Sequence, residues 1–133
     1  MFPVLYRYPA QLYVEPQGVS VIFPDLPGCL PCGENVDQAL QNAKEALALH
    51  LYGMEQDGDH IPEPTAVDQL ENEPGAINVL IEAFMPSVRD REKKRVVKKT
   101  VTIPAWLNAE AEAAHVNFSH VLHEGLIQYL ANN

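Results

Sequence analysis

The sequence predicts an α+β fold in two modules: a small antiparallel sheet with a packed helix, followed by a strand and two helices that need a second copy of the chain. In residues 1–86, three strand-like segments surround one long segment with helical periodicity. In residues 98–133, a short alternating strand precedes two stretches with apolar residues at helical spacing. Residues 87–97 between them are rich in Lys and Arg and predict a basic linker.

The first module begins with two strands that are expected to form a hairpin. Residues 3–15 are rich in aromatic and branched side chains, and residues 16–18 (Pro-Gln-Gly) predict a turn. Residues 19–23 place Val, Val and Phe on one face, as a half-buried strand does. Pro24 ends this strand, and residues 25–33 predict a loop or a short irregular strand.

One helix and one further strand complete the first module. The helix is expected to open at Glu34 or Asn35 and to run to about Glu55, with Asp37 in its first turn. Its apolar stripe consists of Ala39, Leu40, Ala43, Ala46, Leu47 and Leu51. Residues 76–84 form an almost continuous apolar run, which predicts a strand in the middle of the sheet.

The second module opens with a strand whose two faces differ chemically. Val101 and Ile103 point to one side, whereas Lys98, Thr100 and Thr102 point to the other. The apolar side needs a core, and the Lys and Thr side chains have the donors and acceptors that read base edges in the major groove of DNA. A strand before two helices is the order of a ribbon-helix-helix unit, in which two copies of the strand pair antiparallel. Because about 35 residues bury too little surface to fold alone, the segment predicts a homodimer or a higher homo-oligomer.

Two helices are expected after this strand, and Pro104 suits the first helical turn. The apolar stripes of these helices consist of Trp106, Leu107, Ala111 and Ala114 in the first and Phe118, Leu122, Leu126, Tyr129 and Leu130 in the second. Asn117 caps the second helix, or Ser119 does if the helix starts later. Both residues are expected to contact a DNA phosphate, because a helix N-terminus offers free N–H groups. The alternative is an ordinary strand and helical hairpin packed on the rest of the chain.

Charge is divided unevenly along the chain, which has a formal net charge of −9. Residues 1–88 hold two basic residues against thirteen acidic ones, whereas the other seven basic residues all lie within residues 89–99. An acidic body repels nucleic acid, while a basic run beside the strand suits phosphate. We therefore expect phosphate contacts from Lys93, Lys94 and Lys99, with a merely solvated linker as the alternative.

Four sequence elements of the first module resemble one protein family. They are Phe-Pro-Asp-Leu-Pro-Gly-Cys at residues 23–29, Gly33, Ala-Leu-x-Asn-Ala-x-Glu-Ala-Leu at residues 39–47, and Ile-Pro-x-Pro at residues 61–64. In identity and order they resemble the HicB antitoxin family. The resemblance implies that residues 1–86 form a partial, catalytically inactive RNase H-like domain and that residues 98–133 form a ribbon-helix-helix DNA-binding domain.

The function implied by this resemblance is that of an antitoxin of a type II toxin-antitoxin system, not of an enzyme. HicB proteins neutralise a small mRNA-cleaving toxin, HicA, and repress their own operon. The expected partners are therefore a HicA-type toxin and double-stranded operator DNA, with no cofactor. A toxin that attracts RNA is expected to be basic, so the acidic first module is complementary to it. Candidate toxin contacts are Asp25, Leu26, Pro27 and Glu34.

Five side chains resemble parts of reactive sites without completing one. Cys29 and Cys32 match Cys-x-x-Cys, but the pair precedes the helix by a few residues. We interpret both as structural thiols, with a redox or metal role as the alternative. His115, His120 and His123 have no carboxylate at an obvious spacing, and a zinc site would need further ligands. We therefore expect no catalytic residue and no metal site.

Two other function classes remain open. One is a ligand- or metal-sensing ribbon-helix-helix repressor without a toxin partner, and the other is a nuclease with Asp25, Glu45 and Glu82 as metal ligands. No apolar run approaches the roughly 20 residues of a membrane span. The N-terminus lacks a basic segment followed by an apolar one. A cytoplasmic protein without membrane contact is therefore expected.

Overall fold

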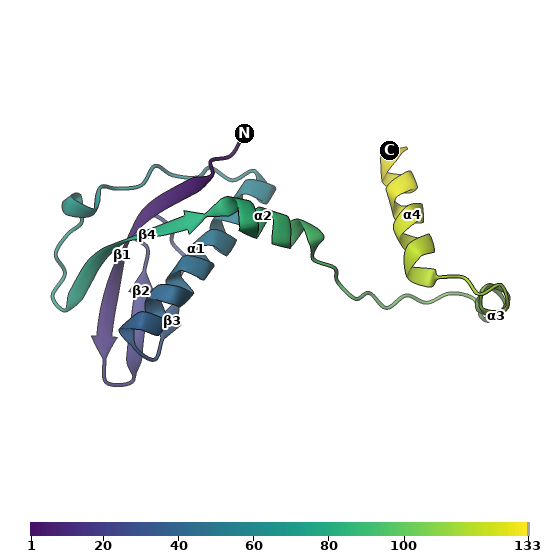
Figure 1. The fold of residues 1–133 in the computed structure, drawn as a ribbon, viewed down its shortest axis with the longest axis horizontal. Coiled ribbons are helices and arrows are strands. Elements are labelled where there is room, and N and C mark those ends of the chain that lie inside the picture. Colours follow the sequence, from purple (N-terminus) through teal and green to yellow (C-terminus); the bar gives the residue numbers. More distant parts are fainter. Residues whose placement is uncertain (133) are drawn as a thin grey trace. The chain divides into compact units, whose positions relative to one another are not determined.

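The computed structural model describes residues 1–132 and divides the chain into two compact units. Unit 1 spans Met1–Arg95, and unit 2 begins at Val96 (Figure 1). No helix within residues 1–132 is both long and apolar enough to cross a membrane.

Unit 1 contains a four-stranded antiparallel sheet in the order β3-β2-β1-β4. The strands are β1 (Leu5–Glu15), β2 (Gly18–Ile22), β3 (Cys32–Gly33) and β4 (Ala76–Phe84). Their expected positions are confirmed, since β1 and β2 form the hairpin and β4 covers the predicted residues. The β1–β2 register places Leu12 opposite Val21, and on the other side of β1 Leu12 lies opposite Ile77.

The prediction that residues 76–84 lie in the middle of the sheet is wrong. The strand β4 is at one edge of the sheet, and β1 lies between β2 and β4. Burial follows this order, because five consecutive residues of β1 from Tyr8 to Leu12 are buried, whereas Ile77 and Leu80 of β4 remain 48% exposed. Because β4 has a neighbouring strand on one side only, part of its apolar run stays exposed within unit 1.

The helix α1 (Val36–Asp57) packs against the sheet and supplies much of the core. Asn35, one of the two predicted helix starts, caps it by accepting a hydrogen bond from the Gln38 amide at 2.8 Å. The predicted stripe is largely confirmed, since it is buried at Ala39, Ala43, Leu47 and Leu51 and partly buried at Leu40 and Ala46. These residues meet side chains of the sheet that include Tyr8, Leu12, Val21 and Phe23.

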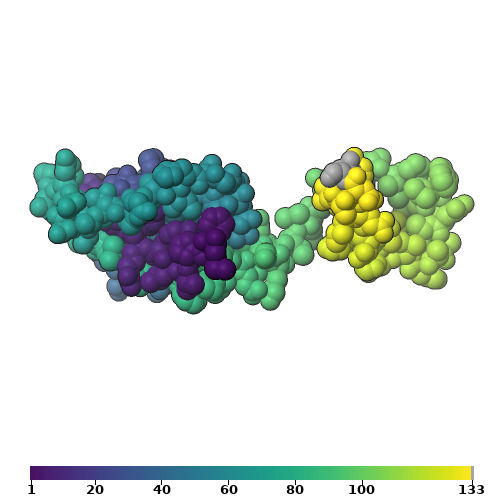
Figure 2. Space-filling model, turned by 90° about the horizontal axis from the view of Figure 1, so that it is seen from above, coloured from purple at the N-terminus to yellow at the C-terminus, as the bar shows by residue number. Residues whose placement is uncertain are grey.

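The segment between α1 and β4 runs back along the sheet and contains a short 3₁₀ helix, η1 (Val67–Gln69). The Tyr8 hydroxyl donates to the Pro62 carbonyl, and the Gln11 amide nitrogen donates to the Glu71 carbonyl at 3.0 Å. Figure 2 shows this teal segment lying beside the purple N-terminal strand. Two polar side chains of the central strand are thereby satisfied by loop carbonyls.

The expected linker over residues 87–97 is largely helical, which corrects its boundary. The helix α2 (Met85–Lys94) follows β4 directly, with Pro86 in its first turn. Met85 and Val88 are buried in the core of unit 1. Only residues 95–104 lack regular structure between the last helix of unit 1 and the first of unit 2.

Unit 2 contains α3 (Ala105–Ala113) and α4 (Phe118–Ala131) after a segment without strand pairing. The expected strand at residues 98–103 is not assigned in the single chain, because strand hydrogen bonds need a partner strand and none lies within residues 96–132. The two helices are confirmed, and Asn117 rather than Ser119 is the cap of α4. Its side-chain oxygen accepts a hydrogen bond from the His120 amide at 3.1 Å.

Gly33 provides a direct test of the contact between β3 and α1. A Cβ at this position would lie 2.5 Å from the Ala39 backbone nitrogen, so the helix itself would have to move. We expect Gly33→Ala to lower the free energy of unfolding by about 1–3 kcal/mol, the usual cost of overpacking. Gly53→Ala is the matched control, because Gly53 lies within α1 with open space around it, and the change should stabilise by up to about 1 kcal/mol. Equal effects of the two changes in urea unfolding would contradict the packing described.

Candidate partner and DNA interfaces

The described part of unit 2 has no buried residue in either helix. Trp106 is 64% exposed, and Leu130 is 70% exposed. Other large apolar residues of the unit are also exposed: Val96, Val97, Val101, Ile103, Leu107, Phe118, Val121, Leu122, Leu126, Ile127 and Tyr129. Exposed apolar surface on this scale marks an interaction site in a soluble protein. The large apolar residues of unit 2 are therefore available for an interaction.

The side chains predicted to read DNA bases lie at the start of unit 2, in the segment before α3. Lys98, Thr100 and Thr102 are all exposed, and so are Val101 and Ile103 between and after them. In the single chain, residues 98–103 are therefore exposed on both faces. Ser119 is exposed in the first turn of α4, one residue after the helix begins.

The basic residues predicted to contact phosphate differ in their surroundings. Lys93 and Lys94 lie in the last turn of α2 and not in a linker, and Lys94 pairs with Asp90 at 3.1 Å. Within residues 1–132, Lys93 and Lys99 form no ion pair. The cation of Lys94 is thus partly compensated by its neighbour, although such exposed pairs contribute at most about 1 kcal/mol.

A buried carboxylate ties α2 to the rest of unit 1. Glu55 of α1 is fully buried in its side chain, and Arg89 of α2 binds it through two nitrogens at 3.0 and 2.7 Å. The Tyr6 hydroxyl of β1 donates to the same carboxylate at 2.7 Å, and Arg89 also donates to the Pro3 carbonyl. Sequence reasoning missed this cluster. Its signal was a Glu four residues after Leu51, in line with the apolar stripe of α1.

The electrostatics of this cluster favour its charged form. Burial alone would raise the pKa of Glu55, but hydrogen bonds from Arg89 and Tyr6 and the Arg89 charge outweigh burial and hold that pKa below its ordinary value of 4.5. The hydrogen bond and charge of Glu55 likewise raise the pKa of Arg89. Glu55 is therefore ionised at neutral pH. Its ion pair with Arg89 holds α2, the last helix of unit 1, against α1.

The loop proposed to touch a toxin is tied to its own unit. Asp25 accepts two hydrogen bonds from Thr65, from the amide at 2.8 Å and from the hydroxyl at 2.7 Å. Leu26 is 2% exposed and belongs to the core, so its side chain is not available as a surface contact, which corrects that expectation. Of the predicted contacts, only Pro27 and Glu34 are classed as exposed.

The two cysteines lie in different surroundings. Cys29 is buried, and burial raises the pKa of its thiol to about 11. Cys32 is exposed on β3. Both thiols are free. A thiol with a pKa near 11 stays protonated at neutral pH and is a poor nucleophile, as the interpretation of Cys29 as structural requires.

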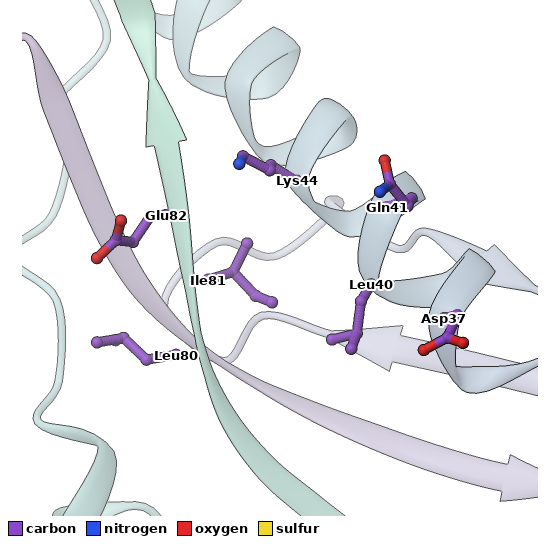
Figure 3. A pocket seen from close by; sticks show the side chains of 7 residues that line it. All are labelled: Asp37, Leu40, Gln41, Lys44, Leu80, Ile81 and Glu82. Carbon is purple, nitrogen blue, oxygen red and sulfur yellow. The ribbon is translucent and has the colours of Figure 1, made fainter.

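A groove runs between α1 and the outer side of β4. Its first part has a volume of about 400 Å³ and is lined by Asp37, Leu40, Gln41, Lys44, Leu80, Ile81 and Glu82 (Figure 3). The second part shares Gln41 and Lys44 and continues to Ser87 and Arg91 of α2. In Figure 3, Ile81 points toward α1, whereas Leu80 and Glu82 point to the other side of β4. The groove is open to solvent. Because β4 is also an edge strand, both its side chains along the groove and its backbone edge are accessible.

Comparison with known proteins gives a consistent result. The family model that describes a HicB-like antitoxin of a bacterial toxin-antitoxin system matches residues 8–125. A protein of Haemophilus phage HP1 (strain HP1c1), described as an uncharacterized 14.9 kDa protein in the rep-hol intergenic region, is 31% identical over 104 residues. That match covers 75% of this chain and 74% of the phage protein.

Three solved structures are similar in fold. A chain of a toxin-antitoxin complex from Streptococcus pneumoniae has a TM-score of 0.61 and 20% identity, covering 94% of this chain and 99% of that one. The Burkholderia pseudomallei antitoxin HicB has a TM-score of 0.54 and 22% identity, covering 94% and 98%. A chain of a HicA3 and HicB3 toxin-antitoxin complex has a TM-score of 0.50 and 26% identity, covering 57% and 95%.

The Glu55–Arg89 pair predicts a specific pH dependence of stability. Because the pKa of Glu55 is depressed in the folded chain, its stabilising contribution is present above pH 4.5 and is lost as the pH falls through the folded value. Glu55→Gln should lower the free energy of unfolding by about 2 kcal/mol at pH 7, less than for a fully buried pair because Arg89 remains 24% exposed. The difference between the two proteins should shrink in acid.

Glu45→Gln is the matched control for this change, since Glu45 pairs with Arg91 at 2.7 Å but both side chains are 53% exposed. That exposed pair should contribute close to nothing. Urea unfolding of the three proteins between pH 3 and pH 7 measures these differences. A Glu55→Gln protein with unchanged stability at pH 7 would contradict the role given to the pair.

Asp25 is expected to stabilise the fold of unit 1 through its hydrogen bonds with Thr65. Asp25→Ala removes both acceptors of Thr65 and should lower the free energy of unfolding by about 1–3 kcal/mol. Glu34→Ala, an exposed change near the same loop, should leave stability within about 0.5 kcal/mol. Thermal or urea unfolding compares them, and an Asp25→Ala protein as stable as the parent would overturn this assignment.

Proposed function

The chain belongs to the family of HicB-like antitoxins of bacterial toxin-antitoxin systems, and from that premise we propose that it neutralises a HicA-type toxin and represses its own operon. In this proposal it is a type II antitoxin and not an enzyme. Unit 1 binds the toxin, and unit 2 dimerises and binds double-stranded operator DNA. The observation that carries the toxin partner is the match of residues 8–125 to the antitoxin family.

Support for a basic toxin partner comes from the charge of unit 1. Met1–Arg95 contains fifteen acidic and seven basic residues. A HicA-type toxin that cleaves mRNA has to attract a polyanion, so its surface is complementary to an acidic one, and electrostatic steering speeds capture. A chain of a HicA3 and HicB3 toxin-antitoxin complex is similar to 57% of this chain, which supports a partner of the HicA type.

Support for dimeric DNA binding comes from unit 2. A second copy supplies both things that unit 2 lacks, a partner strand for residues 98–103 and a surface to cover the apolar side chains of α3 and α4. In the paired ribbon, Val101 and Ile103 turn to that shared core. Lys98, Thr100 and Thr102 then turn to the major groove, while Lys93, Lys94, Lys99 and the N-terminus of α4 at Asn117 and Ser119 contact phosphates.

A truncated chain separates the two functions. Residues 1–95 keep α2 and the Glu55–Arg89 pair, so this fragment retains every hydrogen bond and ion pair described for unit 1. We expect it to rescue growth when co-expressed with the toxin and to fail to bind operator DNA. A folded fragment that did not rescue growth would place the toxin contact in unit 2 or require the avidity of the dimer.

Base reading by residues 98–103 is tested by two substitutions. Thr100→Ala or Thr102→Ala should weaken binding to the operator by about 1–3 kcal/mol and barely change binding to random DNA. Lys93→Ala is the matched control, because loss of a phosphate contact weakens binding to every sequence and reduces the salt dependence. Equal losses of the Thr variants on both DNAs, measured at several salt concentrations, would show that another element reads the sequence.

A further inference from the structure

A pocket of unit 1 lies between the first residues of the chain and the helices α1 and α2. It has a volume of about 490 Å³. Phe2 lines it from the N-terminus, Tyr52 and Glu55 from α1, and Pro86, Arg89 and Lys93 from α2. Sites for small organic molecules in proteins have volumes of about 300–1,000 Å³. All lining residues belong to Met1–Arg95, so a single copy of the chain contains the whole pocket.

The walls of this pocket are held together by hydrogen bonds around the Glu55–Arg89 pair. Arg89 binds the Glu55 carboxylate through two nitrogens and also donates to the Pro3 carbonyl. The Met85 amide, at the start of α2, donates to the Val4 carbonyl at 2.8 Å. The N-terminal residues, α1 and α2 are thereby joined to one another. The pocket is therefore formed before a ligand enters it, as is usual for sites that bind small molecules.

The charges around this pocket leave one cation uncompensated. The Glu55 carboxylate is paired with Arg89, and Asp90, which also lines the pocket, pairs with Lys94 at 3.1 Å. Lys93 lines the pocket too, and it forms no ion pair within residues 1–132. Although unit 1 as a whole is acidic, this pocket therefore offers a place for one negative charge beside Lys93.

Aromatic side chains make up the apolar part of the lining. Phe2 is 48% exposed, Tyr52 is half-buried, and Pro86 is exposed beside them. The Tyr52 hydroxyl forms no hydrogen bond with another residue among residues 1–132. A Tyr side chain offers both a flat apolar ring and a hydroxyl that donates to an acceptor. The matching ligand therefore has a flat apolar body and a single anionic group.

We propose that this pocket binds a small aromatic monocarboxylate. Its carboxylate lies beside the Lys93 ammonium and accepts a hydrogen bond from the Tyr52 hydroxyl, and its ring lies against Phe2 and Pro86. A phosphate is a poorer match, because its second charge would face the carboxylates of Glu55 and Asp90 with no further cation to compensate it. The site lies wholly in unit 1, and neither the proposal nor its test depends on toxin binding or DNA binding.

An NMR titration of the full chain with benzoate, in the absence of toxin and DNA, tests the site. The amides of Phe2, Tyr52 and Lys93 should shift along one saturable curve. Benzamide has the same ring without the charge, and acetate has the charge without the ring. Each of these two should bind at least about fivefold more weakly than benzoate, because each lacks one of the two interactions.

Two substitutions assign the binding to named side chains. Lys93→Ala should weaken benzoate binding by about fivefold, and Tyr52→Phe, which keeps the ring, by about threefold. Lys44→Ala is the matched control, because Lys44 is an exposed lysine of α1 that forms no ion pair within residues 1–132 and does not line this pocket. Its removal changes the net charge equally and should leave the affinity within about twofold.

Several outcomes of these measurements would overturn the proposal. Shifts that do not saturate, or that map to other residues, would show that benzoate does not bind in this pocket. Equal affinities for benzoate and benzamide would remove the anion site, and equal affinities for benzoate and acetate would remove the ring site. Equal losses in Lys93→Ala and Lys44→Ala would reduce the effect to net charge, and an unchanged affinity of Tyr52→Phe would contradict the assigned hydrogen bond.

Discussion

Many large apolar side chains of unit 2 remain exposed within residues 96–132, and the proposed DNA-binding function depends on how that surface is covered. Burying a large apolar side chain stabilises by about 1.5–3 kcal/mol, so leaving Trp106, Leu126 and Leu130 in water forfeits most of the stability available to two short helices. In the proposed dimer, a second copy covers these side chains and supplies the partner strand. Association would then be a condition for the DNA-reading surface to exist.

In unit 1, a buried ion pair holds the last helix, α2, against the rest of the unit. The Glu55 carboxylate accepts hydrogen bonds from Arg89 of α2 and Tyr6 of β1. Three elements far apart in sequence therefore meet at one buried charge. Such a cluster is costly to break, because removal of one partner leaves a buried charge unpaired. It makes α2 part of the N-terminal unit, and the irregular residues 95–104 follow α2 in the chain.

The local features were predictable from sequence because they depend on neighbouring residues. The hairpin, the boundaries of α1 and the Asn35 and Asn117 caps follow from periodicity and capping chemistry. The edge position of β4 was not predictable, because its apolar run is equally typical of a strand with neighbours on both sides. The helical state of residues 87–94 was missed because RDREKK is polar almost throughout, and its burial rests on Met85, Val88 and a distant Glu55. The burial of Leu26 likewise depends on long-range packing.

Trp106 is the one tryptophan of the chain and lies in unit 2, so its fluorescence reports the covering of that unit directly. We expect the emission of the folded full-length protein to be blue-shifted, although Trp106 is 64% exposed in the single chain. The urea midpoint of this signal should rise with protein concentration, because a core shared by two copies is stabilised by mass action. An emission maximum of water-exposed tryptophan in the folded protein, with a midpoint independent of concentration, would contradict a core shared between copies.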